Sequence, residues 1–339
     1  MKNLSVVTGA NGHLGNNLVR VLLANGEAVV AGTRRGNRDQ ALAGLGCRIA
    51  RLDLGEPNSL ERGFAGAQTV YLVGAVFKHW ARDPEKEIYD ANMAATRHAL
   101  DAAAKCGVER IVYVSSLAAT DRLRQPITEA GWNHDASNIY FRSKNDSEQL
   151  AWRLATRHGL EMVSVLPAAM LGEHCYRPTP TMELLQIVLE GKLDVDPGFW
   201  FNFIDVRDVA EGCWLAGKQG RAGERYLLAN EACTSVQELA ATARRLFPDR
   251  KIPIPRVPPK ILVWVVASVA ELWSSLSGTP PKLQRNFLNA FSVQEQCDIT
   301  KAQRELGFNP RPPLATIERT LRHLVAGQST PGGAAVRIA

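Results

Sequence analysis

Short apolar segments alternate with amphipathic ones over roughly the first half of the chain. Mostly apolar runs of strand length lie at 4–7, 28–32, 47–52, 69–73 and 110–114. Between them lie segments with helical spacing of apolar residues, including one that starts near Leu14, a short one at 59–64 and a long one at 87–106. Strands that are apolar on both faces and alternate with helices predict a parallel sheet covered on both sides. With right-handed crossovers, the expected fold class is α/β with a doubly wound Rossmann sheet.

This alternation changes beyond about residue 170, where prolines interrupt the chain. The segment 203–214 is predicted to be a strand entering a helix, and 224–228 a further strand. We therefore expect a Rossmann domain made of residues 1–166 and about 203–230. A smaller, mostly helical lobe is expected at 167–202 and about 231–326, followed by a flexible tail at 327–339 that is rich in Gly, Ser and Ala.

One segment of the second lobe is strongly apolar. After a proline-rich linker at 251–259, residues 260–276 read KILVWVVASVAELWSSL. This length, with Glu271 inside it, is marginal for crossing a bilayer. We expect a helix that lines a substrate pocket or makes peripheral contact with a membrane surface, in preference to a span.

Composition and charge narrow the class of protein. The content of 45% hydrophobic and 22% charged residues is typical of a globular protein. The net charge is +6, but the basic residues are spread along the chain, so we expect no nucleic-acid partner. The six cysteines form no C-x-x-C pair and the histidines show no metal-ligand spacing, so no metal site is predicted. Scattered cysteines and the absence of a signal sequence lead us to expect a cytoplasmic location.

A glycine-rich turn follows the first strand and opens the first helix. Two of its glycines allow the backbone to approach a pyrophosphate, and the third lets the helix lie close to the sheet, while the N–H groups at the helix start face the phosphates. This context predicts a dinucleotide site. The expected contacts are Thr8, Gly9, Asn11, Gly12, His13, Leu14 and Gly15.

The end of the second strand indicates which dinucleotide binds. NAD sites place a carboxylate here for the ribose hydroxyl, whereas this chain has Arg34 and Arg35, then Arg38, with no acid before Asp39. Guanidinium groups suit a 2′-phosphate, so NADPH is the predicted cofactor and NAD the alternative. After the third strand come Asp53 and Leu54. The carboxylate there is expected either to bind the adenine or to cap a helix.

A tyrosine and a lysine four residues apart form the candidate catalytic pair. Tyr140 and Lys144 would lie on one face of a helix, where the cation is expected to lower the phenol pKa and fit the tyrosine for general acid–base work. Ser115 and Ser116 follow the strand at 110–114, whose end should open on the same crevice.

At this point the chain resembles the extended short-chain dehydrogenase/reductases from Thr8 to about Val325. The matching motifs are Thr8-Gly-x-x-Gly-x-x-Gly, Asp53-Leu54, Asn92-Met93-Ala94-Ala95-Thr96, Val114-Ser115-Ser116, Tyr140-x-x-x-Lys144, residues 203–210 and residues 298–310. Within the family the chain looks most like the branch with dihydroflavonol 4-reductase, 3β-hydroxysteroid dehydrogenase and hopanoid-associated epimerase-like proteins.

The resemblance implies a role for each matched residue. Tyr140 would donate the proton, Lys144 would hold the nicotinamide ribose and tune Tyr140, Ser116 would bond the carbonyl, and Asn92 would help organise the site. Arg34 would hold the 2′-phosphate. Further cofactor contacts are expected at Val73, Gly74, Ala75 and Pro167. A homodimer formed through the helices around Asn92 and Lys144 is also implied.

Three departures from the family pattern bear on the reaction. Ala95 replaces a glycine, which is a small change, while no arginine precedes Pro167. No Asp-Glu pair follows Ser116, and these features together argue against a nucleotide-sugar dehydratase.

Aromatic and aliphatic residues are the candidate walls of the substrate site. They favour an apolar steroid-like, polycyclic or acyl ketone, although any one of them could simply be part of the core. The predicted substrate contacts are Phe77, Ser116, Tyr140, Met170, Tyr176 and Phe201. An NADPH-dependent ketone reductase, or the reverse alcohol oxidation, is the first interpretation. A sugar-nucleotide or related epimerase that retains NAD is the alternative, and a non-catalytic NADPH sensor is a third.

Overall fold

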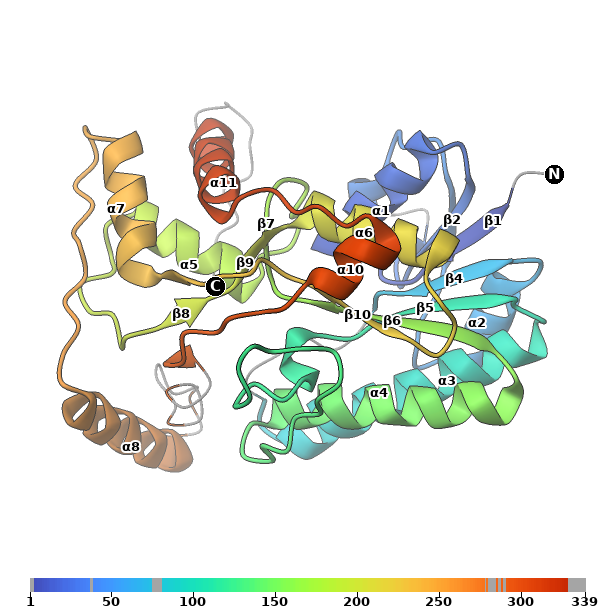
Figure 1. Cartoon of the computed structure of the whole chain (residues 1–339), viewed down its shortest axis with the longest axis horizontal. Coiled ribbons are helices and arrows are strands. Elements are labelled where there is room, and N and C mark those ends of the chain that lie inside the picture. Colours follow the sequence, from blue (N-terminus) through green and yellow to red (C-terminus); the bar gives the residue numbers. More distant parts are fainter. Residues whose placement is uncertain are drawn as a thin grey trace.

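The computed structural model describes residues 3–36, 39–74, 81–277, 279, 285, 288 and 291–328. A seven-stranded parallel sheet, ordered β10-β6-β5-β4-β1-β2-β3, forms the centre of the molecule (Figure 1). Its strands are β1 (Leu4–Val7), β2 (Ala28–Thr33), β3 (Arg48–Arg51), β4 (Thr69–Leu72), β5 (Arg110–Val114), β6 (Glu161–Pro167) and β10 (Arg225–Leu228). The predicted parallel sheet is confirmed.

Helices cover both faces of this sheet. On one face α1 (His13–Ala24) packs against α6 (Val206–Gln219), and on the other lie α2 (Pro57–Phe64), α3 (Ala91–Lys105) and α4 (Ile139–His158) (Figure 1). Successive strand residues enter opposite cores, as Val6 and Val7 do on β1. This arrangement explains why the central strands are largely apolar on both faces, whereas the edge strand β3 begins and ends with the exposed Arg48 and Arg51.

The second lobe contains two small sheets and several helices. β7 (Ala169–Leu171) pairs in parallel with β9 (Phe203–Asp205), and β8 (Trp200–Phe201) pairs antiparallel with β11 (Thr234–Ser235). A separate core joins α5 (Pro180–Leu189), α7 (Val236–Leu246) and α11 (Pro313–Gln328). By contrast, α10 (Thr300–Leu306) returns to pack against α6 and β10 of the main sheet.

Some predicted elements have different bounds in the structure. The helix expected at 87–106 is a π-helical turn at Glu85–Asp90 followed by α3. The first two residues of the expected tail continue α11 to Gln328, and the rest of that tail lies outside the described residues. The apolar segment forms α8 (Lys260–Ser277). Among the helices that the structure describes, none is both long enough and apolar enough to cross a membrane.

Candidate active site

The glycine-rich turn is built by close backbone contacts. Gly9 has φ 61°, and a Cβ there would lie 2.9 Å from the Cα of Gly74, while a Cβ on Gly15 would lie 2.2 Å from the Gly9 carbonyl oxygen. The hydroxyl oxygen of Thr8 accepts the N–H groups of Val73 and Gly74, each at 3.1 Å. These contacts hold the start of α1 against the ends of β1 and β4.

The first turn of α1 fits an anionic group. Gly12 occupies the N-cap and provides no side-chain acceptor, so the N–H groups of the first turn face outward uncapped. No acidic residue lies in this turn. The positive end of the helix dipole attracts negative charge, and Gly12 has no side chain to block the approach of a ligand. Both features match the pyrophosphate of a dinucleotide.

The arginines after β2 are exposed at the rim of the turn. Arg34 and Arg35 form no hydrogen bond or ion pair with any residue that the structure describes. Asp39 is buried, and its carboxylate accepts hydrogen bonds from the Asn11 amide and the Ala41 N–H. The nearest acid is therefore engaged within the protein, whereas the guanidinium groups are available to a ligand. Arg38 lies outside the described residues.

Asp53 and Leu54 adopt different roles. The Asp53 carboxylate accepts the N–H of Gly55 at 2.9 Å and thus closes a local turn, while the N-cap of α2 is Glu56. The expected alternative of a helix cap at Asp53 is therefore wrong, because the helix begins later. Leu54 lines a pocket beside α3.

Tyr140 and Lys144 lie on the first turns of α4, as the spacing predicts. The side chain of Asn138 caps this helix by accepting the N–H groups of Tyr140 and Phe141 at 3.1 and 3.2 Å. Both Tyr140 and Lys144 are buried. The cap fixes where α4 begins and therefore where the phenol is presented.

The two serines after β5 face different partners. Ser115 donates a hydrogen bond to Glu148 at 2.6 Å in the core. Ser116 caps a short 3₁₀ turn by accepting the Ala118 N–H at 3.1 Å, and its side chain is hydrogen-bonded to Tyr140. Of the pair, Ser116 is the one placed to share a substrate oxygen with Tyr140.

Burial dominates the ionisation of Tyr140 and Lys144, the candidate catalytic pair. It raises the pKa of Tyr140 to about 12, although the hydrogen bond from Ser116 acts in the opposite direction. Burial also lowers the pKa of Lys144 to about 8, opposed by the Glu148 carboxylate. The expected lowering of the phenol pKa is wrong for this structure, because desolvation outweighs the other effects. Tyr140 is thus a protonated phenol at neutral pH.

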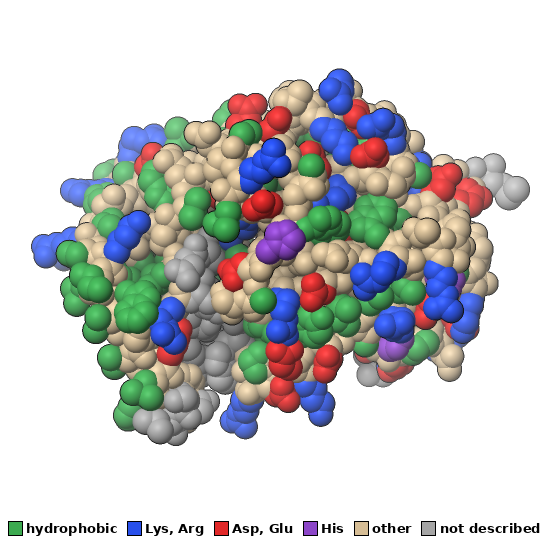
Figure 2. Space-filling view, turned by 60° about the horizontal axis from the view of Figure 1, so that its bottom comes forward, with side chains coloured by type: hydrophobic (Ala, Val, Ile, Leu, Met, Phe, Trp, Pro, Cys, Tyr) green, Lys and Arg blue, Asp and Glu red, His purple; other side chains and the backbone are tan. Residues whose placement is uncertain are grey.

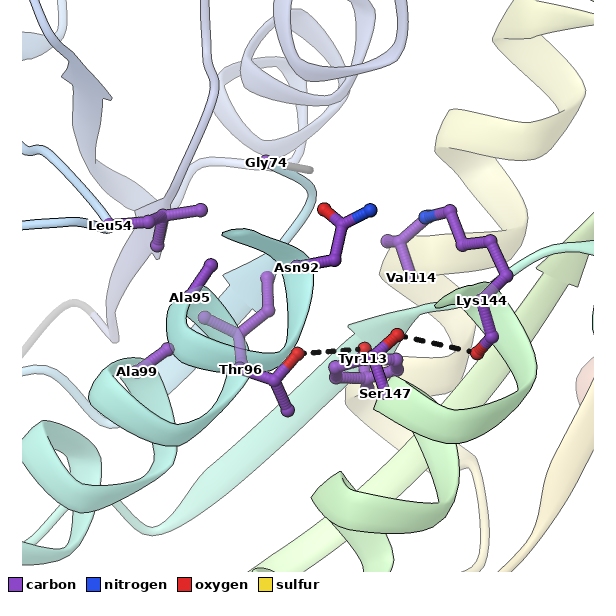
Figure 3. A pocket seen from close by; sticks show the side chains of 11 residues that line it. Leu54, Gly74, Asn92, Ala95, Thr96, Ala99, Tyr113, Val114, Lys144 and Ser147 are labelled. Carbon is purple, nitrogen blue, oxygen red and sulfur yellow. Dashed lines mark hydrogen bonds between the residues drawn. The ribbon is translucent and has the colours of Figure 1, made fainter. Parts of the chain in front are cut away.

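A pocket lies between α3, α4 and the ends of β4 and β5. Figure 3 shows Leu54 and the α3 side chains on one side, Lys144 on the other and Asn92 between them. The Asn92 amide donates to the Ser143 hydroxyl at 3.2 Å, and that hydroxyl donates to the Tyr140 carbonyl at 3.0 Å. Asn92 is therefore tied to the turn that carries Tyr140.

The predicted substrate residues are only partly brought together. Phe201 belongs to an aromatic cluster in which Phe291 contacts Phe141 at a ring separation of 6.3 Å, next to Tyr140. Tyr176 instead lies half-exposed and stacks on His174. Met170 packs against the core of the main sheet. Pro167 ends β6, and Ala75 and Phe77 lie outside the described residues.

Sequence reasoning missed a buried ion pair behind the site. Arg225 on β10 donates to Glu148 at 2.8 and 3.0 Å, and its guanidinium lies 3.8 Å from the ring centroid of Trp132. A single arginine opening the otherwise apolar run of β10 was the available signal.

Comparison with known proteins agrees with this geometry. The sequence model of the NAD dependent epimerase/dehydratase family matches residues 5–229. Sterol demethylase protein B of Methylococcus capsulatus is 31% identical over 90% of this chain and 93% of its own. A putative dihydroflavonol 4-reductase of Synechocystis is 31% identical over 96% of this chain and 94% of its own.

A solved structure supports the fold assignment. Yeast methylglyoxal/isovaleraldehyde reductase Gre2, complexed with NADPH, superposes with a TM-score of 0.77 at 21% identity, covering 96% of this chain and 99% of the Gre2 chain. A likeness at this level of identity bears on the fold alone.

The chain belongs to the NAD-dependent epimerase/dehydratase family, because the family model spans more than half of it. It is an NAD(P)-dependent oxidoreductase of the extended short-chain dehydrogenase/reductase superfamily, as its motifs predict. The glycine-rich turn and the uncapped start of α1 fit such a cofactor, and Thr8, Gly9 and Gly12 are the residues that would hold it.

Proposed function

We propose that the protein is an NADPH-dependent reductase of an apolar ketone, or catalyses the reverse reaction, in which NADP+ oxidises the matching alcohol. The observation that carries this proposal is the protonated, buried phenol of Tyr140, bonded to Ser116 beside an aromatic cluster. A bound NADPH would supply the hydride. The side chains of this chain would then position the carbonyl and provide the proton.

The proton transfer follows from the surroundings of Tyr140. Its hydroxyl would donate to the substrate oxygen as negative charge develops there, and the Ser116 hydroxyl would stabilise the same oxygen. Lys144, buried one turn further along α4, would place a positive charge beside the phenolate that remains. Asn92 would hold the first turn of α4 through Ser143.

The preference for NADPH over NADH rests on Arg34 and Arg35. Both guanidinium groups are exposed and unpaired within the described part of the chain, at the end of β2 where the adenosine ribose of a Rossmann cofactor lies. The buried Asp39 is already bonded to Asn11, so it does not compete for the ribose hydroxyls. A 2′-phosphate would complement this rim.

The apolar character of the substrate is supported by the wall beside Tyr140. Phe141, Phe201 and Phe291 contribute rings from three separate segments. One relative is named for a sterol and another for a dihydroflavonol, and both compounds are polycyclic. The family resemblance also supports a homodimer formed through α3 and α4.

The test is a titration of the purified protein with NADPH and NADH, followed by a screen of polycyclic and acyl ketones that monitors NADPH consumption. Preference for exchangeable NADPH, with turnover of an apolar ketone that Tyr140→Phe abolishes, is expected. Tightly retained NAD, released only on denaturation, would instead establish the epimerase alternative.

A further inference from the structure

Helix α8 presents most of its apolar residues to solvent. Among the α8 side chains that the structure describes, only Val263 and Ala267 are buried, where they pack with Leu288 and Phe199. The exposed side chains are Ile261, Leu262, Trp264, Val265, Val266, Val269, Leu272 and Trp273, each between 47% and 72% exposed. A contiguous apolar face of this kind is typical of an interaction surface.

The charges around this face are mainly positive. Lys251, Arg256 and Lys260 are exposed on the approach to α8, and the one carboxylate of the helix, Glu271, is paired with Arg285. In Figure 2, hydrophobic side chains gather at the left end of the molecule, where α8 lies in Figure 1, with basic side chains beside them. An anionic surface would complement this arrangement.

The two tryptophans of α8 indicate which kind of partner would bind this face. Trp264 and Trp273 are nine positions apart and both exposed, which places them about 13 Å apart along the helix. Indole rings favour the boundary between water and hydrocarbon, where the ring is buried and its N–H stays hydrated. We propose that α8 docks this protein on the surface of a bilayer that contains anionic lipid, lying in its interface without crossing it.

A second copy of the chain fits this face less well. The α8 of a second copy offers no free counter-charge, because its one carboxylate, Glu271, is paired with Arg285, whereas anionic headgroups would neutralise Arg256 and Lys260. The chain as a whole carries a net charge of +6, which also favours approach to an anionic surface.

Aromatic rings connect the docking face to the site. Phe199 packs on the buried side of α8 and contacts Phe291 at a ring separation of 5.8 Å. Phe291 contacts Phe141, whose ring lies 6.1 Å from that of Tyr140. If the proposed reductase function holds, this continuity lets an apolar ketone dissolved in the bilayer reach Tyr140 along an apolar wall.

The experiment is sedimentation of the full-length protein with vesicles of phosphatidylcholine alone or mixed with phosphatidylglycerol. We expect binding to the mixed vesicles that falls with added salt and falls about tenfold or more in a Val265→Asp, Val269→Asp variant. Leu314→Asp is the matched control, because Leu314 is 51% exposed on α11, on the other side of the molecule from α8 (Figure 1).

Several results would overturn the docking proposal. They are no sedimentation of the wild type with anionic vesicles, equal binding to both vesicle types, or equal binding by the α8 variant. A concentration-dependent dimer that the α8 substitutions dissolve would assign the face to a second copy. Because vesicle binding is measured without turnover, failure of the reductase assignment would leave this readout intact. Unchanged thermal unfolding of the variant shows that it is folded.

Discussion

The guanidinium of Arg225, on the edge strand β10, forms a two-point ion pair with Glu148 on the helix that carries Tyr140 and Lys144. The N–O distances are 2.8 and 3.0 Å, and both side chains are almost fully buried. Glu148 also accepts the hydroxyl of Ser115. One carboxylate therefore connects α4, the end of β5 and the edge of the sheet.

Replacing Arg225 with Met should destabilise the fold by about 3 kcal/mol or more, because it leaves the Glu148 carboxylate buried without its cation. Denaturant unfolding monitored by circular dichroism measures the effect. A Glu148→Gln, Arg225→Met double variant should recover part of the loss, since no buried charge remains. A loss below about 1 kcal/mol in the single variant would contradict the assigned role of the pair.

Tyr140→Phe should lower turnover by about a hundredfold or more while leaving NADPH affinity nearly unchanged, because the substitution removes a proton donor and little surface. Steady-state kinetics and a cofactor titration on the same preparation separate the two effects. Near-normal turnover would exclude Tyr140 as the acid.

The affinity of the free enzyme for NADPH should fall as the pH rises through about 8. Burial lowers the pKa of Lys144 to about 8, so its positive charge is present below that pH and lost above it. Fluorescence titration of NADPH between pH 6 and 10 measures the change. Lys144→Met should bind more weakly and show no such step, and a step that persists in this variant would place the titration elsewhere.

Arg34→Ala should weaken NADPH binding by roughly tenfold to a hundredfold and leave NADH binding almost unchanged, because charge-assisted hydrogen bonds to the 2′-phosphate are lost. Arg153→Ala, an equally exposed cation on α4, controls for the general loss of positive charge. An unchanged ratio of the two affinities would move the phosphate contact to another residue.

His13→Phe should make the protein more resistant to mild acid. Burial lowers the pKa of His13 to about 4, although hydrogen bonds to the backbone of Gly172 and Glu173 act in the opposite direction. The neutral ring therefore contributes stability above pH 6.5 that is lost as the pH falls toward 4, by up to about 3 kcal/mol. Urea unfolding at pH 7 and pH 4.5 tests this, and equal acid sensitivity of the variant would refute it.

The sequence alone predicted those features of the structure that depend on residues close together in the chain. The strands of the main sheet and the turn at Gly9 follow from apolar runs and glycine spacing within a few residues. The meeting of Phe141 with Phe291 depends on tertiary folding, so no local pattern could predict it. The phenol pKa was misjudged for the same reason: spacing shows that Lys144 is near Tyr140, but only the folded chain shows how deeply both are buried.

The late position of β10 in the chain has a consequence for biosynthesis. Glu148 emerges from the ribosome 77 residues before Arg225, so a nascent chain of intermediate length contains α4 without the buried counter-charge of Glu148. Closing the core around that helix must then wait until translation has passed Leu228, when β10 can join β6. N-terminal fragments that end before β10 would therefore contain Ser116, Tyr140 and Lys144, the proposed proton-transfer group, without a closed core around α4.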